Sequence, residues 1–306
     1  SVFLSLSLER SKLKNMASLG SMEVEMQTWI SPDERNETKI PAKLKMSDDE
    51  RNLGLISLNY DSTSYQAHGL FNVVFNLFDQ FKLSDTFKID SETLFTFLYE
   101  LKKNYNHVKF HNWNHAVDSA QFLAYQLYFG NLQTVFTPFE IIAMLTAILC
   151  HDVNHDGFST SYNSKAEIPL GILFNNQSVL ETHHCTVAIS ILTKDESNIF
   201  HALDDDDMKK MWSIFISLIL ATDMAKHFNI LEEAKTILQS GKKWQNSENG
   251  RLTIMKIIVK AADLASSVRS FPIADKNSQI VCEEFYRQGD IDKCSSFVYL
   301  NENHHD

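Results

Sequence analysis

The stretch FEIIAMLTAILCHDVNHDG, residues 139–157, joins an apolar segment directly to a group of residue types that bind metal ions. Its first part, residues 139–150, is apolar on almost every side, which is typical of a helix buried at the centre of a bundle. The polar part begins with His151 and Asp152 and contains Gly157, a residue type that favours a helix end. We therefore expect a buried helix that holds His151 and Asp152 rigidly at its end.

Apolar residues recur at helical spacing on both sides of this stretch. One i, i+3, i+4, i+7 stripe follows Ser91, a plausible N-cap, and similar stripes lie in residues 211–219 and 254–261. Alternating, strand-like runs are few, and the chain has only nine glycines and five prolines. The predicted fold class is therefore all-α, a compact multi-helix bundle. The first stripe consists of Leu94, Phe97, Leu98 and Leu101.

Composition excludes several classes of function. The 306 residues are 44% hydrophobic, as in a folded protein, and the formal net charge of −11 without any Lys/Arg-rich stretch argues against nucleic-acid binding. No apolar run approaches the roughly 20 residues that cross a bilayer, so we expect no membrane span. The four cysteines are scattered, without a C-x-x-C pair, which favours a reducing compartment and a cytoplasmic location.

The chain divides by composition near residue 60. Residues 1–60 are polar and mixed in charge, contain Pro32 and Pro41, and show little apolar periodicity. They are predicted to form a flexible polar leader or a loosely docked arm. Residues 61–306 are predicted to form one helical domain. Within it, the acidic run at 204–207 is interpreted as the cap of a following helix, because the glycine and spacing of a calcium loop are missing.

Seven of the twelve histidines lie between residues 107 and 184, several of them in spaced pairs near a carboxylate. Besides residues 151–155, the pairs are in HNWNH (111–115) and in LETHH (180–184). Imidazole and carboxylate groups are ligands that zinc, magnesium and manganese prefer. An i, i+4 spacing places two such groups on one face of a helix. The pattern predicts a metal-dependent hydrolytic site.

The residues also suggest how the work is divided within this site. Of His111 and His115, one can bind metal while the other stays free to donate a proton, although His111 taken alone is more consistent with a polar residue at the core edge. Glu181 is a candidate to set the tautomer of the free histidine. Only one of two adjacent histidines at 183 and 184 can face the site. Asp263 follows an apolar helical stretch and needs a buried partner, which a metal ion can supply.

Four motifs taken in order resemble the class I cyclic nucleotide phosphodiesterases. They are HNWNH at 111, HDVNHDG at 151, LETHH at 180 and AADLA at 261, and the likeness spans about residues 70 to 293. The sequence around LETHHC, NIF and LATDMAKH is most similar to the high-affinity, cyclic GMP-specific branch.

The resemblance implies an activity, two metal ions and a role for each matching residue. It implies an all-α catalytic domain with a dinuclear metal site that hydrolyses a 3′,5′-cyclic nucleotide, cyclic GMP in preference to cyclic AMP, to the 5′-monophosphate. The tighter metal, usually zinc, is bound by His115, His151, Asp152 and Asp263. Asp152 also bridges to a second ion, usually magnesium or manganese. His111 matches the proton donor, Glu181 the residue that orients it, His155 and Thr222 positions around the metal waters, and Phe110, Met224 and Leu264 the substrate pocket.

The sequence departs from the family pattern in three places. Thr160 and Ser266 stand where the family commonly has asparagine. After about residue 293 the sequence ends in CSSFVYLNENHHD, without the glutamine and phenylalanine that clamp the purine, so we expect a catalytic domain truncated there. Two alternatives follow: a metal-binding but inactive form that acts as a partner of the full-length enzyme, or another His-Asp metal phosphohydrolase. A homodimer is compatible with the sequence.

Overall fold

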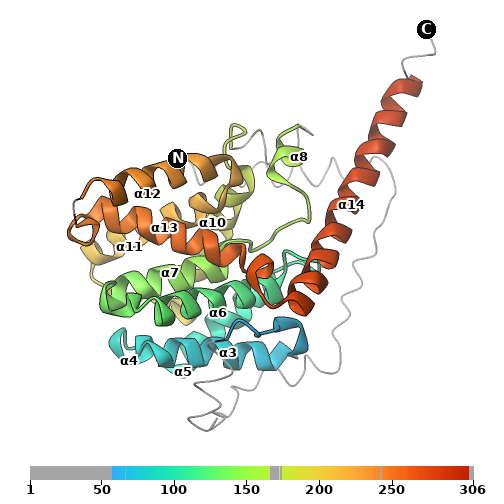
Figure 1. Ribbon diagram of the computed structural model, residues 1–306. Helices are drawn as coiled ribbons and strands as arrows, with labels where there is room; N and C mark the ends of the chain where they lie inside the picture. Colours follow the sequence, from blue (N-terminus) through green and yellow to red (C-terminus); the bar gives the residue numbers. More distant parts are fainter. Residues whose placement is uncertain (1–56, 66, 166–171, 173, 242, 303–306) are drawn as a thin grey trace, which may run out of the picture. The chain divides into compact units, whose positions relative to one another are not determined.

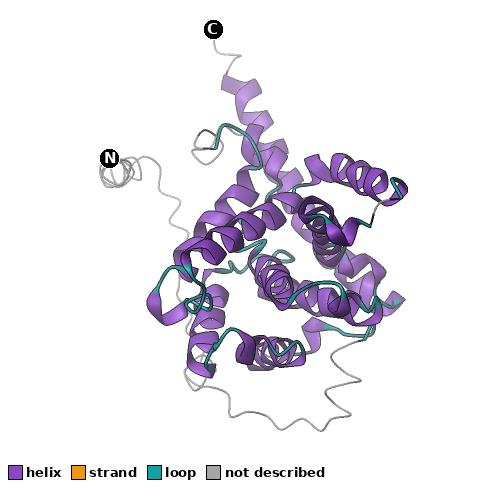
Figure 2. Cartoon of the chain, turned by 90° about the vertical axis from the view of Figure 1, so that its left-hand side faces the viewer, coloured by secondary structure: helices purple, strands orange, loops and turns teal. Residues whose placement is uncertain are grey.

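The computed structural model describes residues 57–65, 67–165, 172, 174–241 and 243–302. The chain divides into two units, residues 1–39 and 40–306, and all described residues belong to the second unit. The predicted leader therefore lies almost entirely outside the described residues. Within them every regular element is a helix and none is a strand, which confirms the all-α fold (Figure 2).

The helices follow one another along the chain with short connections. The α-helices are α3 (Ala67–Gln80), α4 (Leu83–Thr86), α5 (Ser91–Asn104), α6 (Trp113–Phe129), α7 (Pro138–Cys150), α8 (Thr160–Lys165), α10 (Val179–Leu192), α11 (Asp205–Thr222), α12 (His227–Gln239), α13 (Glu248–Asp263) and α14 (Phe271–Glu302). The 3-10 turns are η1 (Ser62–Ser64), η2 (Leu132–Thr134), η3 (Asp195–Ser197), η4 (Met224–Lys226), η5 (Trp244–Asn246) and η6 (Ala265–Val268).

Helix α7 is the buried central helix that the sequence predicts. Every residue from Glu140 to Cys150 is buried, and the helix packs against α6, α11 and α13 (Figure 1). It begins with a capping box, in which Thr137 and Glu140 satisfy each other's backbone amides. Arg251 of α13 donates from Nε to Glu140 Oε1 at 2.6 Å, so the polar start of α7 is also paired. Cys150, at the other end of α7, is fully buried in the core.

The stripe in α5 is buried as predicted, but the helix begins differently. Leu94, Phe97, Leu98 and Leu101 are all at most 1% exposed. The N-cap is Asp90 and not Ser91, because the Asp90 carboxylate accepts the backbone N–H groups of residues 92 and 93 at 2.9 and 2.8 Å. A carboxylate caps the first turn as well as a hydroxyl does, so the boundary moves by one residue.

Helix α11 confirms the interpretation of the acidic run. The side chain of Asp204 is the N-cap and accepts the N–H groups of Asp206 and Asp207 at 3.1 and 2.9 Å.

Among the described residues no single helix is long and apolar enough to span a membrane; α11 and α12 pass that test of length and composition only as a pair bent by 89°.

Residues 57–60, assigned by sequence to the leader, lie against the helical core. The carbonyl of Ser57 accepts hydrogen bonds from Gln121 at 3.2 Å and from Arg269 at 3.1 Å, and Tyr60 is buried. Arg269 also forms a buried ion pair with Asp118 at 3.1 Å. This pair ties η6, which follows α13, to α6.

Candidate metal centre and active site

Four side chains from three helices converge at one end of the core. His115 lies in the first turn of α6, His151 and Asp152 follow directly after α7, and Asp263 is the last residue of α13. Each offers one ligand atom, and these atoms lie within 4.8 Å of one another. The structure therefore brings together the four residues that the sequence predicts as metal ligands.

The distances within this cluster fit a bound cation. His151 Nε2 lies 3.1 Å from both Asp152 Oδ2 and Asp263 Oδ1, and His115 Nε2 lies 3.4 and 3.2 Å from the same two atoms. Ligands about 2.0–2.2 Å from a zinc ion at tetrahedral corners are about 3.3–3.6 Å apart. The Oδ2 atom of Asp152 is buried and has no hydrogen-bond partner among the described residues, although both Nε2 atoms are near it. Its lone pair is available to a cation.

The electrostatics of the cluster point the same way. Burial lowers the pKa of His115, but the carboxylates of Asp152 and Asp263 outweigh burial and raise it to about 9. Burial raises the pKa of Asp263, but His151 and His115 hold it well below its usual range. Two buried carboxylates thus draw positive charge into the cluster. A divalent cation held by these residues would supply that charge while both imidazoles are neutral, and its binding would displace protons.

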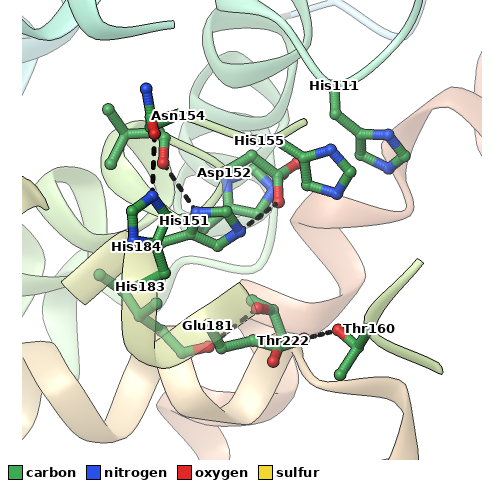
Figure 3. Close-up of polar contacts among 12 residues, drawn as sticks. His111, His151, Asp152, Asn154, His155, Thr160, Glu181, His183, His184 and Thr222 are labelled. Carbon is green, nitrogen blue, oxygen red and sulfur yellow. Dashed lines mark hydrogen bonds and ion pairs between the residues drawn. The ribbon is translucent and has the colours of Figure 1, made fainter. Parts of the chain in front are cut away.

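Backbone carbonyls fix the orientation of the surrounding imidazoles. His151 Nδ1 donates to the carbonyl of Ile148 at 2.7 Å, which leaves Nε2 for the cluster. His184 Nδ1 donates to the carbonyl of Val153 at 2.7 Å, and its Nε2 lies 3.8 Å from Asp152 Oδ1. His183 instead bonds Asn154 at 2.8 Å (Figure 3). Only one member of the pair faces the site, as predicted.

His111 lies at the side of the cluster and outside the ligand set. Its ring stacks on His155, with centroids 4.1 Å apart and planes inclined by 20°. The Nδ1 atom of His155 accepts the backbone N–H of Gly157 at 3.0 Å. The Nδ1 atom of His111 contacts the carboxylate of Glu284, on α14. His111 is thus held from two sides.

A cavity of about 610 Å³ opens over these residues. Its volume is in the range typical of small-molecule sites. Of the predicted site residues, it is lined by His111, Asp152, His155, Glu181, Thr222, Met224 and Asp263. The hydroxyl of Thr222 donates to the carbonyl of Ile219 at 2.8 Å, which ties it to the end of α11.

The cavity combines a carboxylate-rich cluster with a histidine that lies outside that cluster. Carboxylates gather around the cluster, where cations can bind, and His111 stands at the same cavity with one ring nitrogen already paired. With cations held by the cluster, such a site could polarise a bound ester, and His111 could protonate its leaving group.

Comparison with known proteins identifies the family. Residues 110–303 match the family model described as 3'5'-cyclic nucleotide phosphodiesterase. The chain belongs to the cyclic nucleotide phosphodiesterase family.

Two curated relatives of this phosphodiesterase family member carry cyclic GMP in their names. The chain is 31% identical over 235 residues to the high affinity cGMP-specific 3',5'-cyclic phosphodiesterase 9A of Pan troglodytes, covering 76% of this chain and 39% of that protein. It is 33% identical over 221 residues to the cGMP-specific 3',5'-cyclic phosphodiesterase of Drosophila melanogaster, covering 72% of this chain and 20% of that protein. The chain thus spans well under half the length of these relatives.

Two solved structures share the phosphodiesterase fold. The phosphodiesterase domain of Salpingoeca rosetta rhodopsin phosphodiesterase superposes with a TM-score of 0.76 at 27% identity, covering 82% of this chain and 77% of that one. LmjPDEB1 in complex with IBMX gives a TM-score of 0.76 at 30% identity, covering 86% of this chain and 79% of that one.

One residue predicted for the phosphodiesterase site makes a different contact. Glu181, predicted to orient His111, accepts a hydrogen bond from Thr160 at 3.3 Å (Figure 3). The carboxylate that contacts His111 Nδ1 is that of Glu284. Burial raises the pKa of Glu181 to about 7, and its Oε2 atom has no hydrogen-bond partner within the part of the chain that the structure describes. Glu181 lies in the first turn of α10 and lines the cavity together with Thr160, which stands where the family commonly has asparagine.

Two of the three residues predicted for the substrate pocket do not line the cavity. Met224 does, but the Phe110 ring packs on the ring of His115, with centroids 4.6 Å apart. Leu264 is the C-cap of α13 and is 43% exposed. The sequence missed Glu284 and Phe285, which line the cavity from α14. Their position follows from the path of α14, and no local pattern reveals it.

Proposed function

We propose that this chain hydrolyses a 3′,5′-cyclic nucleotide to the 5′-monophosphate in a reaction that depends on divalent metal ions. The observation that carries the proposal is the convergence of the four-residue ligand cluster and His111 on one cavity. We further propose that cyclic GMP is preferred over cyclic AMP, which the names of the relatives at 31% and 33% identity support.

The donor set favours two different ions. His115, His151, Asp152 and Asp263 would hold zinc, because two imidazoles and two carboxylates suit that ion. Asp152 would also contribute to the binding of a second ion, magnesium or manganese, because these ions prefer oxygen ligands. When bound, the ions supply Lewis-acid polarisation of the phosphate and lower the pKa of water.

The residues of the chain itself then supply binding and proton transfer. Asp152 and Asp263 carry negative charge that bound cations would neutralise. The cyclic phosphate would therefore bind at the ligand cluster. His111 would donate a proton to the 3′ oxygen as the bond from that oxygen to phosphorus breaks, since its ring lies at the cavity beside the cluster. His155 fixes the plane of that ring by stacking.

An inactive, metal-binding form is the second candidate. Exposed aromatic side chains on α14 favour it, because Phe271 is 80%, Phe285 53% and Tyr286 71% exposed, as at an interaction surface. Such a form would bind zinc at the same cluster and associate with a full-length enzyme. A cytoplasmic location and a homodimer stay predictions for either candidate.

One experiment separates these functions. The purified chain is analysed for bound zinc and assayed with cyclic GMP and cyclic AMP in added magnesium. Turnover of a cyclic nucleotide that chelation abolishes and metal restores supports the proposal. Zinc without turnover favours the inactive form, and hydrolysis of nucleoside phosphates alone would indicate a different His-Asp phosphohydrolase.

A further inference from the structure

We propose that a second cavity, lined by α11, η4, α12 and α13, binds a phosphate monoester as its dianion. The cavity has a volume of about 310 Å³, and none of the residues that line it also lines the catalytic cavity. Helices α11, α12 and α13 pack against one another (Figure 1). Two lysines, Lys226 and Lys256, line this cavity, and we call it the lysine cavity.

The two lysines have no partner of opposite charge. Lys226 is the last residue of η4, and Lys256 lies in α13. Both are partly buried, and neither side chain forms an ion pair or a hydrogen bond with another described residue. The chain has 39 acidic and only 28 basic residues, so carboxylates are abundant elsewhere. Two partly desolvated ammonium groups at one hollow attract an anion.

The carboxylate of Glu233, which also lines the cavity, leaves these lysines unneutralised. Its Oε1 atom accepts the hydroxyl of Thr253 at 2.9 Å and the side-chain amide of Asn249 at 3.4 Å. Glu233 is thus hydrogen-bonded to α13, and it forms no ion pair with Lys226 or Lys256. The charged side chains around the cavity carry two positive charges and one negative charge, so the site is cationic.

Neutral hydrogen-bond donors complete the polar part of the lining. The hydroxyl of Ser217 and the amide of Asn229 belong to the lining, and neither side chain has a hydrogen-bond partner among the described residues. Helix α12 begins at the same place, with Lys226 as its N-cap and no side chain that caps its first turn. The N–H groups and the dipole of such a turn add to the attraction for negative charge.

These groups match a phosphate monoester better than other small anions. A phosphate monoester carries about two negative charges and three strong acceptor oxygens near neutral pH. Two ammonium groups, a hydroxyl and an amide can pair with them. A carboxylate and a phosphodiester each carry only one negative charge and leave one lysine without its counter-charge.

The rest of the lining is apolar, which indicates an organic group on the phosphate. Ala221 and Ile230 are 2% and 7% exposed, and Leu220 is partly buried. A volume of about 310 Å³ is at the lower end of the range typical of small-molecule sites. The cavity therefore suits a monoester whose organic group packs on these side chains.

The product of the proposed function belongs to this class of ligand. Hydrolysis converts a cyclic diester, with one negative charge, into a 5′-monophosphate with about two. The lysine cavity should therefore favour the product over the substrate. Residues 222–225 line the catalytic cavity, and Ala221 and Lys226 on either side of them line the lysine cavity. The choice of a nucleotide rests on the proposed function, whereas the anion site does not.

The test measures the binding of phenyl phosphate to the full chain by isothermal titration calorimetry at pH 8. EDTA is present, because it removes cations from the catalytic cavity and leaves carboxylates that repel an anion there. The test variant combines Lys226→Met with Lys256→Met, which keep the length of the side chains and remove both charges. The matched control is Lys235→Met, since Lys235 lies on α12 outside the cavity and pairs with Glu232 at 3.5 Å.

The double variant should bind phenyl phosphate about a hundredfold more weakly, roughly tenfold for each charged hydrogen bond. The control should stay within about twofold of the wild type. An unchanged affinity in the double variant would overturn the inference. Binding that the wild type loses in EDTA would overturn it as well, because the ligand would then depend on cations in the catalytic cavity.

Other probes test the class of ligand. Dimethyl phosphate, a diester with one charge, and inorganic phosphate, which lacks an organic group, should both bind more weakly than phenyl phosphate. Equal affinity for either one would overturn the assignment to a monoester. A comparison of 5′-GMP with phenyl phosphate distinguishes the product nucleotide from a smaller monoester, and the binding of each should require both lysines.

Nuclear magnetic resonance of the wild type supplies a readout that needs no variant. In protein labelled with ¹³C-lysine, phenyl phosphate should shift the side-chain signals of Lys226 and Lys256 and leave that of Lys235 in place. Unshifted signals of Lys226 and Lys256 at saturation would overturn the inference. A wild type that hydrolyses no cyclic nucleotide contradicts the proposed function and leaves these binding measurements unaffected.

Discussion

The two sides of the cavity are built in different ways. On the ligand side, His115 and His151 are 5% and 1% exposed and are carried by α6 and the end of α7, both packed into the core. On the donor side, His111 precedes α6, its side chain is 21% exposed, and the carboxylate of Glu284 on α14 contacts it. The ligand geometry therefore depends on the core, whereas the donor geometry depends on a few contacts of one later helix. Metal binding and proton donation should be separable.

The largest effect should come from the ligand side. Asp152→Ala removes a carboxylate that contacts both imidazoles of the cluster, so we expect loss of bound zinc together with all turnover. Metal analysis by mass spectrometry and the cyclic nucleotide assay measure both. Asp156→Ala is the control, because Asp156 lies in the same loop and outside the cluster. Full metal content in Asp152→Ala would show that the cation binds elsewhere.

Removal of the proton donor should abolish catalysis and leave metal binding intact. His111→Ala should lower kcat by roughly 10²–10⁴, the range of general acid catalysis, while zinc content stays near that of the wild type. His107→Ala, which alters an exposed histidine nearby, should change neither quantity. If His111→Ala loses its metal, the separation of the two sides is wrong.

Stability should show the same contrast. Leu145 on α7 is fully buried, so Leu145→Ala should lower the free energy of unfolding by about 2–5 kcal/mol. Phe285 on α14 is 53% exposed, so Phe285→Ala should cost less than about 1 kcal/mol. Urea unfolding of the metal-free proteins measures both. Similar losses would mean that α14 is as much part of the core as α7.

The smallest effect concerns the pH dependence of stability. Burial raises the pKa of Glu181 from 4.5 to about 7, so the folded state binds its proton more tightly than the unfolded state. Stability from this group is present below pH 4.5 and is lost as pH rises through about 7. The free energy of unfolding of Glu181→Gln should therefore increase relative to that of the wild type as pH rises, by at most about 3 kcal/mol. Unfolding of metal-free protein between pH 4.5 and 8 tests this, and a constant difference contradicts it.

The sequence predicted the ligand side better than the donor side. The apolar run of α7 and the motif after it show where His151 and Asp152 lie, because both residues directly follow the end of a buried helix. Glu284 could not be found this way, since it lies 173 residues after His111 and reaches it only through the path of α14. Glu181 stands among histidines, and this local pattern does not indicate which side of the cavity α10 forms.

The most direct test of the central account is anomalous X-ray diffraction at the zinc edge from crystals grown with zinc. The account predicts one peak bounded by His115 Nε2, His151 Nε2, Asp152 Oδ2 and Asp263 Oδ1. A peak between His111, His155 and Glu284, or zinc bound only outside the cavity, would contradict it.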